Sequence, residues 1–346
     1  MYEVRVGRMF EVDNIVATIC GEISRGQPFE PSSINLTDYF ISSTKGDTEE
    51  TFLVNVDQKE GMTKTQAIVP KYPIDRQVIA IDSTSITLGQ IPDGLVGAIR
   101  ASIITKPAGR TEHSLEKYGP YLIPVTNQNK EQLYQETFKA VYGIETHAHA
   151  PDCSKTLDRI RNFLERYLQL RVTGSCIDSL ILMDGSLIGG TVADPKSIMK
   201  NIVSNSNSRK NSLVAVSKST GLTLRESQKN ILSLLDDKQA PCYIGDIRDR
   251  ITQQKERYLG SIYVARLAPL GEPFRIDIPS KTPTSHSEIF NEVAGLAEED
   301  GYPEELRLAH MTCVHSSIEI IELQSAAITL HGLTLKEELR RRIFPL

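Results

Sequence analysis

The sequence predicts an α/β domain built on a mixed sheet, because short apolar strand segments alternate with helical patterns from residue 77 onward. The clearest strand is the unbroken apolar run Leu180–Met183, which ends at Asp184 and a Gly-Ser turn. A similar run, Val78–Ile81, ends at Asp82. Open α/β sheets bind ligands at the carboxyl ends of their strands, so both aspartates are candidates for chemistry. The alternative is that each aspartate only begins a turn, where its side chain accepts backbone N–H groups.

Composition limits the class of protein. A chain of 346 residues forms one large or two unequal domains, and its 40% apolar and 24% charged residues exclude a disordered chain. The apolar runs are far shorter than the ~20 residues that cross a bilayer. The N-terminus also lacks the basic and then apolar layout of a signal peptide. We therefore expect an intracellular, cytoplasmic protein.

Cysteine and charge counts narrow the kinds of site. The 5 cysteines are widely spaced and contain no C-x-x-C pair, which argues against a disulfide framework or a structural zinc site and predicts reduced, mostly buried thiols. A net charge of −5 gives no bulk attraction to nucleic acid, yet a few well-placed basic residues suffice for phosphate contacts. Three groups are either such basic rims or ordinary solvated surface: Arg209-Lys210, Lys218 with Arg225 and Lys229, and Arg340-Arg341-Arg342.

The first seventy residues differ in pattern from the rest. Short apolar or alternating segments occur at Tyr2–Val6, Ile15–Cys20 and Thr51–Val56, separated by stretches that contain Gly, Ser and Pro. This pattern predicts a β-rich N-terminal segment over residues 1–70. Residues 71–346 are expected to form the main α/β domain.

The elements of the main domain follow from periodicity and turn residues. Asp93-Gly94 stands directly before a strand and predicts a hairpin turn, while the polar tract 204–212 predicts a surface loop. The expected strands are Val78–Ile81, Leu95–Ile104, Leu180–Met183, Leu213–Ser217, Ile262–Leu267 and Phe274–Ile278, and the expected helices lie around 155–171, around 195–203 and in one long stretch from Pro303.

The helix around 155–171 carries a third acid of interest. Its apolar stripe includes Leu164, and Glu165 lies at the flank of that stripe. From there Glu165 could reach the edge of the sheet as a site residue. It could equally be an exposed side chain that contacts Gln169 one turn later.

The last predicted helix contains a tyrosine and a histidine. Pro303 suits the first turn of a helix, Tyr302 stands just before it, and Leu306, His310 and Cys313 are expected on one inward apolar face. His310 is then either a core histidine or, with Tyr302, a group that contacts phosphate and the attacking water.

These motifs in combination resemble the NurA nucleases, which work with the hexameric HerA DNA translocase. The resemblance covers roughly residues 75–325 and includes Asp82 after a strand, RNFLERY, LILMDGSL, LVAVSKST, IYVARLAPLGEPFRIDIP and GYPEELRLAH. It implies an RNase H-like sheet flanked by helices, in a nuclease domain over residues 71–346. It further implies that Asp82, Glu165 and Asp184 bind Mn²⁺ or Mg²⁺ and that Tyr302 and His310 complete the catalytic set. Family members commonly read Asp-Gly-Ser at the first motif, whereas this chain reads Asp82-Ser83-Thr84.

The implied function is a metal-dependent DNA nuclease, a 5'-3' exonuclease and single-strand endonuclease that acts in end resection and repair. Phosphodiester hydrolysis needs hard cations held by oxygen ligands, and three carboxylates suffice for them. Lys218, at a strand end, either neutralises phosphate charge or is an ordinary surface lysine. The expected partners are single- and double-stranded DNA ends, a HerA-type hexameric ATPase and a second copy in a homodimer. Residues 1–70 and the C-terminal tail, with its apolar residues beside three arginines, are candidates for these protein contacts.

Two rival interpretations remain. The segment HAHAPDC offers His147, His149, Asp152 and Cys153 as metal ligands, but it lacks a second cluster to complete tetrahedral coordination. The rival functions are a stand-alone RNase H-like resolvase or structure-selective nuclease, and a catalytically silent adaptor. The intact carboxylates argue against the adaptor, and the GYP…AH helix argues against a generic resolvase.

Overall fold

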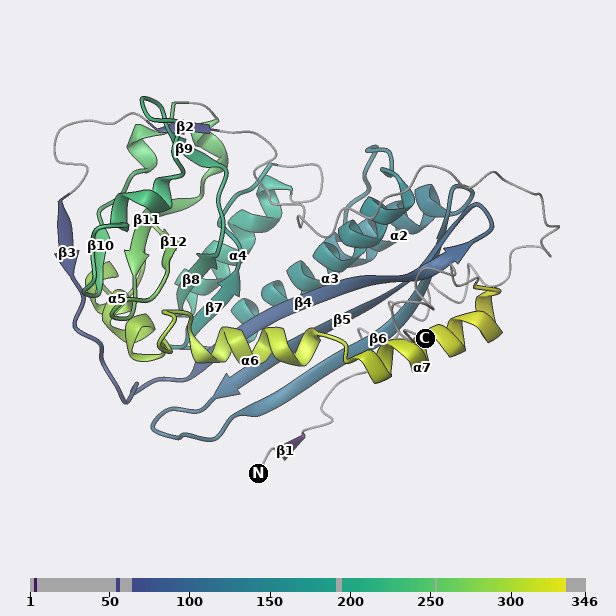
Figure 1. Cartoon of the computed structure of the whole chain (residues 1–346), viewed down its shortest axis with the longest axis horizontal. Helices are drawn as coiled ribbons and strands as arrows, with labels where there is room; N and C mark the ends of the chain where they lie inside the picture. The colour runs from purple at the N-terminus through teal and green to yellow at the C-terminus, as the bar shows by residue number, and fades with distance from the viewer. Residues whose placement is uncertain (1–2, 5–53, 57–63, 191–194, 253, 334–346) are drawn as a thin grey trace, which may run out of the picture.

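The computed structural model describes residues 3–4, 54–56, 64–190, 195–252 and 254–333. Within these residues the centre of the molecule is a ten-stranded mixed sheet with helices on both faces (Figure 1). Its strands, in spatial order, are β1 (Glu3–Val4), β6 (Ser114–Thr126), β5 (Gly94–Lys106), β4 (Val78–Ile91), β7 (Leu180–Asp184), β8 (Ser212–Ser217), β12 (Pro273–Pro279), β11 (Gly260–Arg266), β10 (Cys242–Ile244) and β3 (Thr65–Ala67). A small second sheet pairs β2 (Val54–Val56) with β9 (Leu222–Leu224).

The strand directions change across the large sheet. Strands β4, β5 and β6 form an antiparallel meander, β4, β7 and β8 run parallel, and β8, β12, β11 and β10 are again antiparallel. This order confirms the predicted RNase H-like mixed sheet flanked by helices.

Two helical layers cover the sheet. Helices α2 (Lys130–Tyr142), α3 (Cys153–Ser175) and α4 (Lys196–Ser208) cover one face, and α5 (His286–Gly295) and α6 (Glu304–Cys313) cover the other (Figure 1). Strand β4 serves both layers, since Ile79 and Ile81 pack on the α3 side while Val78 and Ala80 pack on the α6 side. Burial on both faces explains why the central strands are uninterrupted apolar runs. The described elements also include three short 3₁₀ helices, Ile231–Leu235, Arg248–Arg250 and Lys255–Arg257.

The structure corrects the predicted end of the first strand. Asp82 does not terminate it, because β4 continues to Ile91. The reason is long-range pairing: Asp82 lies opposite Ser102 of β5, and this ladder runs on to the hairpin. The predicted hairpin turn at Asp93-Gly94 is confirmed, with Asp93 at a φ of 60°.

Two helix predictions are also corrected. The long helix expected from Pro303 is two helices, because Val314 is extended and Ser316 begins α7 (Ser317–His331) with a capping box that includes Glu319. The tract 204–212 is not wholly a loop, since α4 extends to Ser208.

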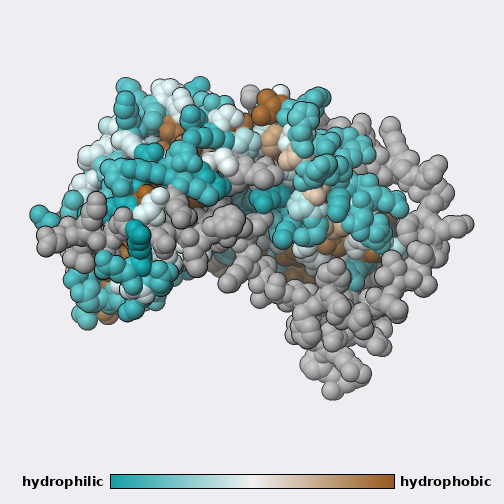
Figure 2. All heavy atoms as spheres, turned by 90° about the horizontal axis from the view of Figure 1, so that it is seen from above, coloured by the Kyte–Doolittle hydropathy of each residue, from teal (hydrophilic) through white to brown (hydrophobic). Residues whose placement is uncertain are grey.

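The described strands of the N-terminal seventy residues join sheets of the main body: β1 pairs with β6, β2 with β9 and β3 with β10. The predicted strand Ile15–Cys20 and the tail from residue 334 lie outside the described residues. None of the described helices combines the length and apolar character needed to cross a membrane. Figure 2 shows a face whose described residues are mostly hydrophilic, with apolar residues in separate patches. The four described cysteines are free, and Cys242 and Cys313 are buried.

A buried ion pair supports the chain segment that follows β7. Arg275 and Asp277, each 1% exposed on β12, are joined by hydrogen bonds of 2.8 Å from Nε to Oδ1 and from Nη2 to Oδ2. The same Oδ2 accepts the backbone N–H of Leu187 at 3.0 Å, so Asp277 also anchors the turn after Asp184.

We expect Asp277→Ala to lower the free energy of unfolding by about 3–5 kcal/mol, because it leaves a buried guanidinium without its carboxylate partner. Urea denaturation measures the change. Asp237→Ala is the matched control, since Asp237 pairs with Lys238 at the surface and its loss should have little effect. Equal losses in the two variants would contradict the prediction.

Candidate active site

The strand register brings two of the predicted acids together. Parallel pairing of β4 with β7 ends at Ile81 opposite Met183, so the next residues, Asp82 and Asp184, lie side by side where the strands part. Their positions alternate with Ile81 and Met183, which places both on the α6 side of the sheet. Asp184 ends β7 as predicted, and Gly185, at a φ of 100°, forms the turn after it.

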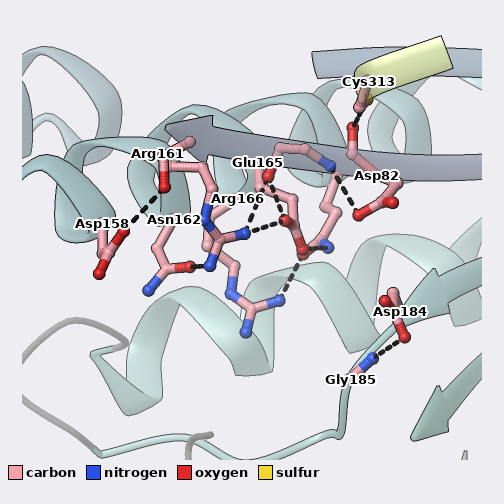
Figure 3. A network of polar contacts seen from close by, with 12 residues as sticks. Asp82, Asp158, Arg161, Asn162, Glu165, Arg166, Asp184, Gly185 and Cys313 are labelled. Carbon is pink, nitrogen blue, oxygen red and sulfur yellow. Dashed lines mark hydrogen bonds and ion pairs between the residues drawn. The ribbon is translucent and has the colours of Figure 1, made fainter. Parts of the chain in front are cut away.

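Glu165 reaches the same region from helix α3 on the opposite face (Figure 3). Its side chain is buried, which excludes the exposed alternative, although the contact with Gln169 is present: Gln169 Nε2 donates to Glu165 Oε1 at 3.1 Å. Arg161, one turn earlier, donates to Oε2 at 3.0 Å. The hydroxyl of Ser83 donates to the same Oε2.

Helix α6 contributes His310 and Cys313. His310 Nδ1 lies 2.8 Å from Asp82 Oδ2, and this hydrogen bond raises the pKa of His310. The side chain is 47% exposed, so the predicted inward apolar position of His310 is wrong. Leu306 and Cys313 are buried as predicted, and Ala309 is the third buried residue of this face. Cys313 donates from Sγ to the carbonyl oxygen of Asp82 at 3.2 Å, and burial raises its pKa to about 12.

Lys218 and Tyr302 lie beside Asp184. Lys218 follows β8, with its Nζ 3.7 Å from Asp184 Oδ2 and 4.3 Å from the centre of the Tyr302 ring. The Tyr302 hydroxyl is buried and has no hydrogen-bond partner among the described residues. Burial, together with the charges of Asp184 and Asp82, raises its pKa, so the hydroxyl keeps its proton and can act as a donor.

The charge balance of these side chains fits a divalent cation. Burial raises the pKa of Glu165 despite Arg161 and Arg166, and burial raises the pKa of Asp184 despite Lys218. The charge of Asp82 raises both pKa values further. The negative charge of these crowded carboxylates is therefore only partly compensated by the nearby basic groups. Together with the buried Tyr302 hydroxyl, they offer oxygen atoms that a hard cation can bind.

The spacing of the three carboxylates qualifies this fit. Among the described residues, the group of three potential ligands whose atoms all lie within 4.8 Å of one another is His113, Glu304 and Glu305. Direct binding of one ion by Asp82, Glu165 and Asp184 together therefore requires at least one of these side chains to move, and Asp184, whose side chain is 30% exposed, is the most exposed of the three.

The His113 group already has its counter-charge. Lys106 Nζ lies 3.1 Å from Glu305 Oε1, and His113 Nε2 lies 3.4 Å from the same oxygen. Although burial alone would raise it, His113 and Lys106 hold the pKa of Glu305 below its usual value. This cluster is an ion pair inside the fold.

In the rival segment HAHAPDC, two of the potential metal ligands make other contacts. His149 pairs with Glu131 at 3.3 Å, and Asp152 caps α3 by accepting the backbone N–H of Lys155 at 2.9 Å. Its four potential ligands do not meet within 4.8 Å in the part of the chain that the structure describes.

Sequence reasoning missed Ser83, Arg161 and Arg166. Ser83 and Arg161 donate hydrogen bonds to Glu165, and Arg166 donates to its partner Gln169. Figure 3 shows Arg161 and Arg166 beside Glu165. The spacing of Arg161 and Gln169, four residues to either side of Glu165, was a usable signal, because such residues are neighbours on a helix. Nothing in the local pattern identified Ser83, whose partner is 82 positions away in the chain.

The fold of this chain is similar to that of a solved nuclease structure. The crystal structure of the NurA nuclease from Sulfolobus solfataricus matches with a TM-score of 0.51 and 16% identity, over 77% of this chain and 87% of that chain. A NurA structure with manganese matches at 0.44 and 9% identity over 77% and 90% of the two chains. An endonuclease V from Ciona intestinalis bound to DNA matches at 0.40 and 13% identity over 76% and 93%. The first match shows a shared fold, and the other two are too distant to add to it.

No protein of curated function matches the sequence. The sequence profile of the NurA domain, however, matches residues 76–314, which span β4 to the end of α6 and contain every predicted site residue. The chain therefore belongs to the NurA family.

Proposed function

We propose that the protein is a divalent-metal-dependent DNA nuclease that acts at DNA ends. Membership of the NurA family supports a nuclease. The observation that carries the metal-dependent mechanism is the placement of Asp82, Glu165 and Asp184, from three separate elements, in one partly buried region with too little positive charge.

In this proposal the three carboxylates would hold Mn²⁺ or Mg²⁺, and the ion would supply the positive charge that activates water and stabilises the leaving oxygen. Lys218 approaches Asp184 from the side that is open to solvent, with its side chain 43% exposed, and its ammonium can bind a phosphate oxygen. The protonated Tyr302 hydroxyl can donate a hydrogen bond to the same phosphate.

His310 is placed to move a proton. Its Nδ1 is committed to Asp82, so Nε2 is the nitrogen that can exchange a proton with water or DNA. The raised pKa brings the imidazole nearer to the range in which it can serve as an acid at neutral pH.

The protein partners belong to the same proposal. A chain with a net charge of −5 grips DNA weakly, so 5'-3' digestion in end resection needs a partner that holds and feeds the strand. Similarity to NurA supports a homodimer docked on a HerA-type hexameric translocase.

We expect Asp184→Ala, Asp82→Ala and Glu165→Ala each to abolish cleavage while the protein stays folded, because each removes an oxygen ligand. The assay uses end-labelled single- and double-stranded DNA with Mn²⁺, Mg²⁺ or EDTA, and circular dichroism checks the fold. Asp158→Ala, on the same helix as Glu165, is the control that should retain activity. Wild-type activity of any ligand variant at saturating metal would remove that residue from the site.

His310→Ala is expected to lower the cleavage rate by roughly 10²-fold, the usual worth of a positioned acid–base group. Stability should change little, because the side chain is half exposed. The sign of the pH dependence follows from the raised pKa: the pair with Asp82 stabilises the fold fully below about pH 6.5 and is lost as the pH rises through the higher folded-state value.

In EDTA, the difference in melting temperature between the wild type and His310→Ala should therefore be larger at pH 6 than at pH 9. A large loss of stability with normal activity per folded molecule would instead identify His310 as a structural residue.

For the assembly, sedimentation at micromolar concentration should give a dimer, and a cognate HerA-type ATPase should stimulate digestion by the wild-type chain. A monomer whose activity is indifferent to the ATPase would favour the stand-alone resolvase.

A further inference from the structure

Ser83 is a single residue that contacts two of the three carboxylates. Its backbone N–H donates to Asp82 Oδ1 at 2.7 Å, and its hydroxyl donates to Glu165 Oε2. Successive side chains of a strand point to opposite faces, so Asp82 turns toward α6 and Ser83 toward α3. Ser83 thereby links acids that belong to opposite layers of the domain.

Arg161 fixes the direction of the serine hydroxyl. Its Nη1 donates to Ser83 Oγ at 3.0 Å and to Glu165 Oε2 at 3.0 Å. A hydroxyl has one proton and two lone pairs. Because Arg161 fills a lone pair of the oxygen, the proton of Ser83 is directed to Glu165.

The other carboxylate oxygen of Glu165 is held from the helix. Gln169 Nε2 donates to Oε1 at 3.1 Å, and Gln169 in turn accepts a hydrogen bond of 2.7 Å from Arg166. All these groups are buried or nearly so. The carboxylate of Glu165 therefore accepts hydrogen bonds at both oxygens. Because a carboxylate has about four acceptor positions, these three hydrogen bonds leave a position open for a metal ion.

We propose that Ser83 is a positioning residue that presets the Glu165 carboxylate for the metal and so sets the affinity of the site. This inference rests on the proposed function. An ion that meets a fixed ligand loses less binding free energy to reorganisation, and partners of metal ligands typically contribute about 10- to 100-fold to metal affinity or activity. Without the hydroxyl, Glu165 Oε2 is held by Arg161 alone, a cation that competes with the metal.

Strand β4 provides a matched control two residues further on. Ser85 lies on the same face as Ser83, and its hydroxyl donates to Asp158 Oδ1 of α3 at 2.7 Å. Ser85→Ala thus removes the same kind of hydrogen bond between the same two elements. Asp158 is two helical turns from Glu165, about 10 Å along the helix axis, so the metal ligands are not disturbed.

The experiment measures Mn²⁺ binding to the full chain without DNA, by electron paramagnetic resonance titration, together with cleavage at saturating Mn²⁺. We expect Ser83→Ala to raise the Kd for Mn²⁺ about 10-fold. Cleavage at saturation should stay near the wild-type rate, because the bound ion then orients Glu165 itself. Ser85→Ala should leave the Kd unchanged, although both variants lower the melting temperature to a similar degree.

Ser83→Cys, which keeps the shape but donates weakly, should give an intermediate Kd and is the variant to use if Ser83→Ala does not fold. An unchanged Kd in Ser83→Ala, or an equal rise in Ser85→Ala, would overturn the positioning role alone. A wild-type chain that neither binds Mn²⁺ nor cleaves DNA would overturn the proposed function as well.

Discussion

The site depends on the point at which β4 parts from β7. Hydrogen bonding between these strands stops at Ile81 and Met183, while β4 stays paired with β5 through Asp82 and beyond. The carboxylates of Asp82 and Asp184 thus lie where the two strands separate. At this point each strand is still paired with its other neighbour, β5 or β8, which fixes the backbone of both residues. A slip of one residue in this register would turn Asp82 to the α3 face and Ser83 to the α6 face.

Charge compensation explains the residues that gather around this point. A buried carboxylate without a partner is costly, and each acid here has a nearby basic group: Arg161 for Glu165, Lys218 for Asp184 and the His310 imidazole for Asp82. The pKa values of Glu165 and Asp184 nevertheless remain raised. Compensation by the chain is therefore incomplete, which leaves the site ready to accept a cation and is the physical basis for the proposed metal dependence.

The side chains of the candidate site come from the sheet and from both helical layers, so the site is a property of the whole domain. Helix α3 supplies Glu165 from one face, and α6 places His310 against Asp82 from the other. The buried Arg275–Asp277 pair on β12 fixes the turn after Asp184 through Leu187. A loss of packing in either layer would change the relative positions of these side chains, and with them the geometry of the site.

The sequence by itself determined the fold class, the strand that delivers Asp184, the helix that carries Glu165 and, through combined motifs, the NurA family. Each depends on local periodicity, turn residues or ordered motifs, which are written in neighbouring residues. Only the tertiary structure decided that Asp82 lies within a strand, that the C-terminal helix breaks after Cys313 and that Ser83 binds Glu165. These features arise from contacts between distant segments, such as Asp82 and His310, 228 positions apart. Local patterns carry no record of which distant group completes a hydrogen bond, because that partner is chosen only when the layers pack.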